Sequence, residues 1–157
     1  MEAEIYFDFI YDLKTKVEFE LMDRKKEKIV SERYSGVSRN VSVGGLSFIG
    51  SKQVNQGDLL HMDVFLPGSK EAIDMKGLVA WCKPIVPSYE DRLQEDVEGK
   101  RTFEVGVRLL NVNGLSVDES IHHDAVYDVD WSVVLESIFG NFRMLMEGKY
   151  KPKDKSK

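Results

Sequence analysis

Cysteine is nearly absent from this chain. Cys82 is its only cysteine, so no intrachain disulfide can form and a metal cluster held by several thiolates is excluded. The chain also lacks any run of about 18 consecutive apolar residues, so we expect no transmembrane helix. No basic stretch followed by an apolar run stands at the N-terminus, so we expect no secretory signal and a cytoplasmic location.

An excess of positive charge is lacking as well. The net charge of −5 gives no electrostatic basis for binding nucleic acid along its backbone. A length of 157 residues with 42% hydrophobic residues suits one folded domain with short appendages. We expect residues 1–16 to flank that domain, and the lysine-rich residues 149–157 to form a disordered basic tail.

Alternating apolar residues predict short β-strands along the first two thirds of the chain. Val17, Phe19 and Leu21 alternate with acidic residues, and residues 60–66 and 103–109 repeat this period. Other apolar segments predict further strands, over residues 29–41 with an interruption at Ser35-Gly36, from Leu46 onward, and over residues 73–81. Turn-forming segments separate them, and residues 84–102 form a polar loop. About six strands at this spacing predict a mainly β fold, a small antiparallel β-barrel over residues 17–110.

The last part of the chain changes its period. Apolar residues recur at steps of three and four from Trp131 to Met146, which predicts an amphipathic C-terminal helix. Asp130 is the expected N-cap and Gly148 the expected end, so residues 111–148 are predicted as a loop followed by this helix. The favoured role of the helix is to cover one mouth of the barrel. The alternative is a surface for a partner protein or a homodimer.

The most informative segment is Asn40-Val41-Ser42-Val43-Gly44-Gly45-Leu46-Ser47-Phe48. It places an amide, a hydroxyl and two glycines between β-branched residues. Asn and Ser side chains bind nearby backbone groups, and Gly44-Gly45 allow positive φ and close approach of another molecule. The segment therefore predicts a sharp bend between two strands that displays polar groups.

Several motifs in one order resemble the PilZ domain, a bacterial module best known for binding cyclic di-GMP. Asn40, Ser42 and Gly45 are similar to its Asp/Asn-x-Ser-x-x-Gly signature. Later segments resemble the strands that follow it: Gly57-Asp58, Val64-Phe65-Leu66-Pro67-Gly68, Val79-Ala80-Trp81 and Gly106-Val107-Arg108-Leu109. The resemblance implies a PilZ-like β-barrel. It also implies a signalling role in motility, surface attachment and biofilm formation, or polysaccharide export, through docking onto another protein.

The resemblance also implies where a nucleotide would bind. PilZ domains that bind cyclic di-GMP carry Arg-x-x-x-Arg before the first strand, because a guanidinium offers a planar fork of donors for guanine and phosphate. No two arginines of this chain lie four residues apart, and residues 1–16 contain none. The ligand-binding residues implied by resemblance, together with the two arginines that precede them, are Arg33, Arg39, Asn40, Ser42, Gly44 and Gly45.

Two versions of this function stay open. We expect a degenerate or nucleotide-independent adaptor that contacts an unidentified protein. The alternative is a genuine cyclic di-GMP receptor in which Arg33 and Arg39 act with Asn40, Ser42 and Gly45. Titration with the nucleotide separates the two.

Other candidate sites are weaker. His122-His123-Asp124 suggests metal ligands, but a solvated loop is the favoured interpretation because no third histidine or cysteine lies near in the sequence. His61 is predicted to face outward, and Cys82 to be a core thiol. We find no catalytic constellation and expect neither an enzyme nor a bound cofactor or metal. A single-stranded nucleic-acid-binding barrel is a remote alternative, through exposed aromatics such as Tyr6, Phe7, Tyr11 and Tyr34.

Overall fold

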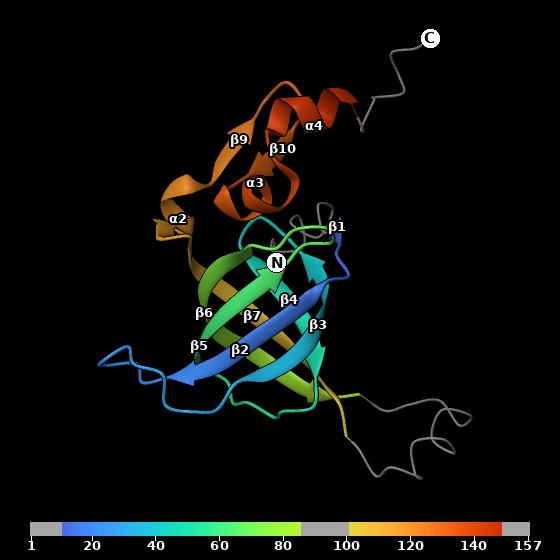
Figure 1. Cartoon of the computed structure of the whole chain (residues 1–157). Coiled ribbons are helices and arrows are strands. Elements are labelled where there is room, and N and C mark those ends of the chain that lie inside the picture. Colours follow the sequence, from blue (N-terminus) through green and yellow to red (C-terminus); the bar gives the residue numbers. More distant parts are fainter. Residues whose placement is uncertain (1–10, 86–100, 149–157) are drawn as a thin grey trace, which may run out of the picture.

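The predicted barrel is present in the computed structural model of the chain, which describes residues 11–85 and 101–148 (Figure 1). All strand pairings are antiparallel, and the mainly β fold expected from the sequence is confirmed. The barrel consists of β2 (Lys16–Met22), β3 (Tyr34–Val41), β4 (Gly45–Gly50), β5 (Leu59–Phe65), β6 (Ala72–Pro84) and β7 (Phe103–Val112).

Strand order closes the sheet on itself. The strands follow one another as β3-β2-β5-β6-β7-β4, and β3 also pairs with β4. A two-residue strand, β1 (Tyr11–Asp12), pairs with the last residues of β3. Closure gives each of the six barrel strands a neighbour on both sides, which removes the exposed edges of an open sheet.

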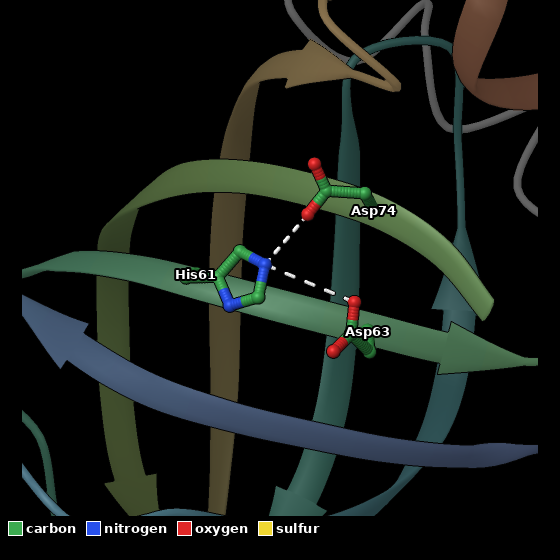
Figure 2. A group of neighbouring side chains, drawn as sticks. All are labelled: His61, Asp63 and Asp74. Carbon is green, nitrogen blue, oxygen red and sulfur yellow. Dashed lines mark hydrogen bonds and ion pairs between the residues drawn. The ribbon is translucent and has the colours of Figure 1, made fainter. Parts of the chain in front are cut away.

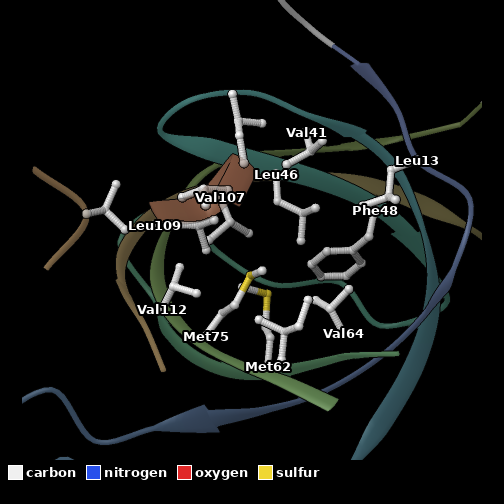
Figure 3. Packing of buried hydrophobic residues seen from close by; sticks show 14 of the residues in the cluster. Leu13, Val41, Leu46, Phe48, Met62, Val64, Met75, Val107, Leu109 and Val112 are labelled. Carbon is white, nitrogen blue, oxygen red and sulfur yellow. The ribbon is translucent and has the colours of Figure 1, made fainter. Parts of the chain in front are cut away.

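One face of every barrel strand fills the interior. Phe19, Phe48, Met62 and Val105 are fully buried, and apolar side chains from all parts of the barrel converge on its axis (Figure 3). The rings of Phe19 and Phe48 pack in a tilted arrangement with centroids 4.8 Å apart, which joins β2 to β4 across this interior. The alternation of apolar residues in most of β2 and β5 therefore has its expected cause, since the apolar side chains of each strand face a closed core.

The C-terminal segment lies over one end of the barrel (Figure 1). It contains β8 (Leu115–Ser116), α2 (Val117–Ser120), β9 (His122–Asp124), β10 (Val129–Trp131), α3 (Val133–Phe139) and α4 (Phe142–Gly148). The Trp131 and Phe142 rings are in tilted contact with centroids 4.7 Å apart, and Val133, Val134 and Leu135 are buried. The apolar stripe therefore packs within the chain. A homodimer through residues 131–146 stays a prediction.

The single helix predicted from Trp131 to Met146 is wrong in its extent. Trp131 belongs to β10, Ser132 and not Asp130 is the N-cap, and the helical region is divided at Gly140. Gly140 has φ of 91°, a conformation that no α-helix accommodates, and its N–H bonds to the carbonyl oxygen of Glu136 as a C-cap. The apolar period continues across this break, so periodicity alone could not locate it.

Two further expectations are corrected. The strand predicted over residues 29–41 begins at Tyr34, and Ser35-Gly36 lie inside it without an interruption. His122, His123 and Asp124 form β9 and pair with β10, where a loop was expected. None of the helices in the described ranges is long and apolar enough to cross a membrane. The predictions for residues 1–10, most of the loop over 84–102, and the lysine tail fall outside the described residues.

Candidate functional site

The bend between β3 and β4 is fixed by backbone hydrogen bonds. The N–H of Ser42 donates to the carbonyl oxygen of Gly45 at 2.9 Å, which closes the turn. The N–H of Leu109 donates to the carbonyl oxygen of Gly44 at 2.9 Å. The bend predicted from the sequence is therefore tied to β7 on its far side.

The two glycines of the bend differ in their surroundings. Neither Gly44 nor Gly45 uses the positive φ that glycine allows. A Cβ on Gly45 would lie 2.9 Å from the carbonyl oxygen of Val107, whereas one on Gly44 would meet nothing within 4 Å. Gly45 is required because β7 approaches closely, while Gly44 leaves open space beside the bend.

Two irregularities in strand pairing flank the bend. The β3–β4 register shifts between Ser38 and Asn40, and the β6–β7 register shifts between Val79 and Trp81. Such bulges re-aim side chains and are frequent beside functional sites. Here the second shift leaves both Ala80 and Trp81 exposed on the outer surface of β6.

A pocket of about 380 Å³ lies between the bend and the neighbouring strands β6 and β7. Of the predicted site residues, Asn40, Ser42, Gly44 and Gly45 line this pocket together. Sequence reasoning did not select the other nine lining residues, among which are Ser47, Trp81, Glu104, Gly106 and Arg108. Ser47, Trp81, Gly106 and Arg108 stand in the segments that resemble the family, but the direction of Trp81 depends on the bulge in β6.

Trp81 offers the pocket an exposed aromatic ring, and Ser47 offers it an unpaired hydroxyl. The Trp81 indole lies directly over Gly106, where a Cβ would come within 2.1 Å of the ring, and 41% of the residue is exposed. Ser47 is 8% exposed, and within the described part of the chain its hydroxyl oxygen has no hydrogen-bond partner. An unpaired buried hydroxyl is costly, so it marks a point where a bound polar group would be stabilised.

Charge in the pocket is mixed. Arg108 has no ion-pair partner among residues 11–85 and 101–148. Arg39, on β3, lies beside the pocket with its Nη1 atom 3.6 Å from the Glu104 carboxylate that lines it. Lys83 lies 5.0 Å from the centre of the Trp81 ring. The pocket can therefore hold a flat polar molecule, but a carboxylate stands within it.

Arg33 lies elsewhere. Its Nε, Nη1 and Nη2 atoms donate to Glu18 (2.7 Å), Glu20 (2.7 Å) and Asp63 (2.6 Å) on the outer surface of β2 and β5. Arg33 is not among the lining residues. The hydrogen bond to Asp63 is the main cause that raises the pKa of Arg33, against the effect of burial, so its charge is fixed in this network.

Other singled-out residues are placed outside the pocket. His123 is exposed and bonds Asp130 (2.7 Å) and Asp128 (3.1 Å), while the Nδ1 atom of His122 lies near the Ser120 carbonyl oxygen. Cys82 is half-buried and packs against the core from outside. Tyr34 packs on Phe19, with ring centroids 5.5 Å apart.

Comparison with known families decides the resemblance. The model of the PilZ domain matches residues 13–119, which is more than half of the chain. The chain belongs to the PilZ domain family. PilZ domains are receptor and adaptor modules of cyclic di-GMP signalling, and this one is a divergent member without the Arg-x-x-x-Arg motif.

Among solved structures, this chain is similar to the Bacillus subtilis inhibitor of motility (MotI/DgrA). The two share 16% sequence identity with a TM-score of 0.40, and the match covers 63% of this chain. The chain spans 40% of the length of the MotI/DgrA structure. A comparison with curated proteins finds no significant match.

Proposed function

We propose that this PilZ domain is a regulatory adaptor that acts through contacts with another protein, without tight binding of cyclic di-GMP. The processes it would regulate are those of its family: motility, attachment or polysaccharide export. The proposal concerns the chain as a binding module and assigns it no catalytic step.

The observation that carries the proposal is the placement of Arg33. The sequence offers no Arg-x-x-x-Arg motif, so a receptor would have to recruit Arg33 and Arg39. All three nitrogen positions of the Arg33 guanidinium are occupied by carboxylates that would be left unpaired if it turned away. Recruiting Arg33 would therefore cost several charge-assisted hydrogen bonds before any ligand contact formed.

The charges of the pocket support the same conclusion. Cyclic di-GMP carries two negative phosphates, whereas the pocket contains the Glu104 carboxylate. Arg39 is engaged with that carboxylate, which leaves Arg108 as the lining arginine without an ion-pair partner in the described residues. One guanidinium cannot clamp two phosphates and two guanine edges at once.

A genuine receptor is the second candidate, and one observation favours it. The unpaired Ser47 hydroxyl, the exposed Trp81 ring and Arg108 meet in one pocket with Asn40 and Ser42. That combination supplies a stacking surface, a cation and hydrogen-bonding groups for a nucleotide. In this version Arg108 and not Arg33 would supply the charge.

Calorimetric titration of the full chain with cyclic di-GMP tests the proposal. We expect no saturable binding tighter than a Kd of about 100 µM, equivalent to about 5.5 kcal/mol. Sub-micromolar binding would overturn the adaptor proposal. If such binding were then lost in Asn40→Ala and Arg108→Ala, the receptor version would replace it.

Genetic complementation tests the signalling role itself. In the source organism, deletion of the gene is expected to alter swimming, attachment or polysaccharide export, and the wild-type chain to restore it. An adaptor that needs no nucleotide predicts that Asn40→Ala and Arg108→Ala restore the phenotype equally well. Failure of both variants at normal protein levels would instead favour a ligand-gated receptor.

A further inference from the structure

A group of ionisable side chains lies on the outer surface of the barrel, on strands β5 and β6. Figure 2 shows the His61 ring on β5 facing Asp63 on the same strand and Asp74 on β6. The His61 Nε2 atom lies 2.6 Å from Asp74 Oδ1 and 3.8 Å from Asp63 Oδ1. One ligand atom from each side chain lies within 4.8 Å of the others. Three good metal ligands therefore converge on one point.

Strand register places like charges directly opposite one another at this point. Asp63 pairs with Asp74 on β6 and with Glu18 on β2, so three carboxylates form one cross-strand row. Like charges directly opposite destabilise a sheet unless a cation lies between them. Arg33 forms ion pairs with Glu18 and Asp63, but it does not contact Asp74. Between Asp63 and Asp74 the positive charge comes from the His61 ring when its Nε2 atom donates to Asp74 at 2.6 Å, so a divalent ion bound there would occupy a place where a cation already stabilises the sheet.

The remaining atoms of two ligands are already held by other groups. The Nδ1 atom of His61 lies 2.8 Å from a carboxylate oxygen of Glu20, which can only accept, so Nδ1 is the donor. The Nε2 atom lies 2.6 Å from Asp74 Oδ1, which also can only accept, so without a metal Nε2 donates as well and the ring is protonated. A bound metal would replace the Nε2 proton and would face Asp63 and Asp74. The Oδ2 atom of Asp63 accepts from Arg33 at 2.6 Å, which leaves Oδ1 directed toward His61. A carboxylate that orients a ligating histidine is the usual supporting arrangement of protein zinc sites.

We propose that His61, Asp63 and Asp74 form a divalent-metal site for Zn²⁺ or a similar borderline ion, with solvent completing the coordination. Tetrahedral zinc with bonds of about 2.0–2.1 Å separates its ligand atoms by about 3.3 Å. The 2.6 Å pair must open and the 3.8 Å pair must close, by less than about 1 Å each. Asp74, with 58% of its side chain exposed, is free to make this adjustment.

The site differs in place and chemistry from the pocket at the β3–β4 bend. None of its three ligands lines that pocket. Binding would link β5 to β6 on the outside of the barrel and would displace a proton from His61 wherever the ring is protonated. Imidazole favours zinc and its neighbours over Mg²⁺, which prefers an all-oxygen shell that keeps several waters.

Titration of the full chain with Zn²⁺, after removal of metals by a chelator, tests this site at about pH 7.5, since metal binding is favoured when ligands can lose their protons. We expect one saturable site, and a melting temperature that rises with Zn²⁺ concentration. His61→Gln and Asp74→Asn should each lower the affinity by more than about 100-fold. Glu20→Gln keeps all three ligands and should lower it by about 10–100-fold.

His122→Gln is the matched control, because His122 is exposed and lies outside the site. It should bind Zn²⁺ as the wild type does. Two results would overturn the proposal: no saturable Zn²⁺ binding by the wild type, or unchanged binding by both His61→Gln and Asp74→Asn. Asp74→Asn keeps the test valid if His61→Gln fails to fold, because Asp74 is largely exposed. Mg²⁺ in place of Zn²⁺ is expected to leave the melting temperature unchanged.

Discussion

The hydroxyl of Ser132 donates a hydrogen bond to the carbonyl oxygen of Val43 and accepts one from the N–H of Val134 at 3.1 Å. Val43 lies in the bend between β3 and β4, and Ser132 is the N-cap of α3. One nearly buried side chain therefore joins the helical segment to the bend that lines the pocket.

Replacing Ser132 should weaken both connections. Ser132→Ala removes the helix cap and leaves the Val43 carbonyl oxygen without its hydroxyl donor, so we expect a loss of about 1–2 kcal/mol in the free energy of unfolding. Urea denaturation measures this loss. Ser35→Ala, on an exposed position of β3, is the control and should stay within about 0.5 kcal/mol of the wild type. Equal stabilities of the two variants would show that Ser132 does not stabilise this contact.

Gly36 should tolerate no side chain. A Cβ at this position would lie 2.6 Å from the carbonyl oxygen of Ile49, a backbone atom that cannot move without disturbing the β3–β4 pairing. Gly36→Ala is therefore expected to destabilise the barrel by about 1–3 kcal/mol. Gly44→Ala provides the contrast, since its Cβ would enter open space and should cost less than about 0.5 kcal/mol. Thermal denaturation of both variants measures the difference, and a neutral Gly36→Ala would contradict it.

Arg33 should contribute to stability and not to ligand binding. Arg33→Met leaves Glu18, Glu20 and Asp63 facing one another without their shared cation, so we expect a loss of about 1–3 kcal/mol. Arg143→Met is the control, because Arg143 is half exposed and pairs with one carboxylate, that of Asp124, whereas Arg33 pairs with three, so it should cost less than Arg33→Met. If Arg33→Met kept full stability but lost a measurable nucleotide affinity, the role assigned to Arg33 would be wrong.

Stability should fall in acid partly through Glu20. Burial opposes its ionisation, but hydrogen bonds from His61 and Arg33 prevail and lower the pKa of Glu20 below the usual value of 4.5. A depressed pKa in the folded state contributes stability above the unfolded pKa, and this stability is lost as pH falls through the folded pKa. We expect Glu20→Gln to be less stable than the wild type at about pH 6 and the two to converge toward about pH 3. Denaturation curves at both pH values check this, and a constant difference would refute it.

The strands were predictable where burial enforces alternation. Val17, Phe19 and Leu21 on β2 show the pattern because their strand lies against a closed core. Gly36 was taken for an interruption because a glycine in sequence does not show that another backbone lies against it. The break at Gly140 was missed for a related reason: the apolar stripe runs on through it, and only its φ of 91° ends the helix.

The site was predictable in its local part only. Asn40, Ser42 and Gly45 lie near one another in sequence and line one pocket, so a linear motif could find them. Trp81 and Arg108 reach the same pocket through the pairing of β6 and β7, and a bulge decides where Trp81 points. The contacts of Arg33 with Glu18 and Asp63 depend on the register of β2 and β5, which no local pattern reveals.

Closure of the barrel limits the ways in which a partner protein can bind to it. Since β3 pairs with both β2 and β4, the described part of the barrel wall leaves a partner peptide few edges on which to extend the sheet, and these include the end of β6 beyond its pairing with β5 and the outer edges of the β9–β10 pair. Elsewhere on the barrel a partner protein would contact side chains, and substitutions at exposed positions such as Trp81 test whether it does so.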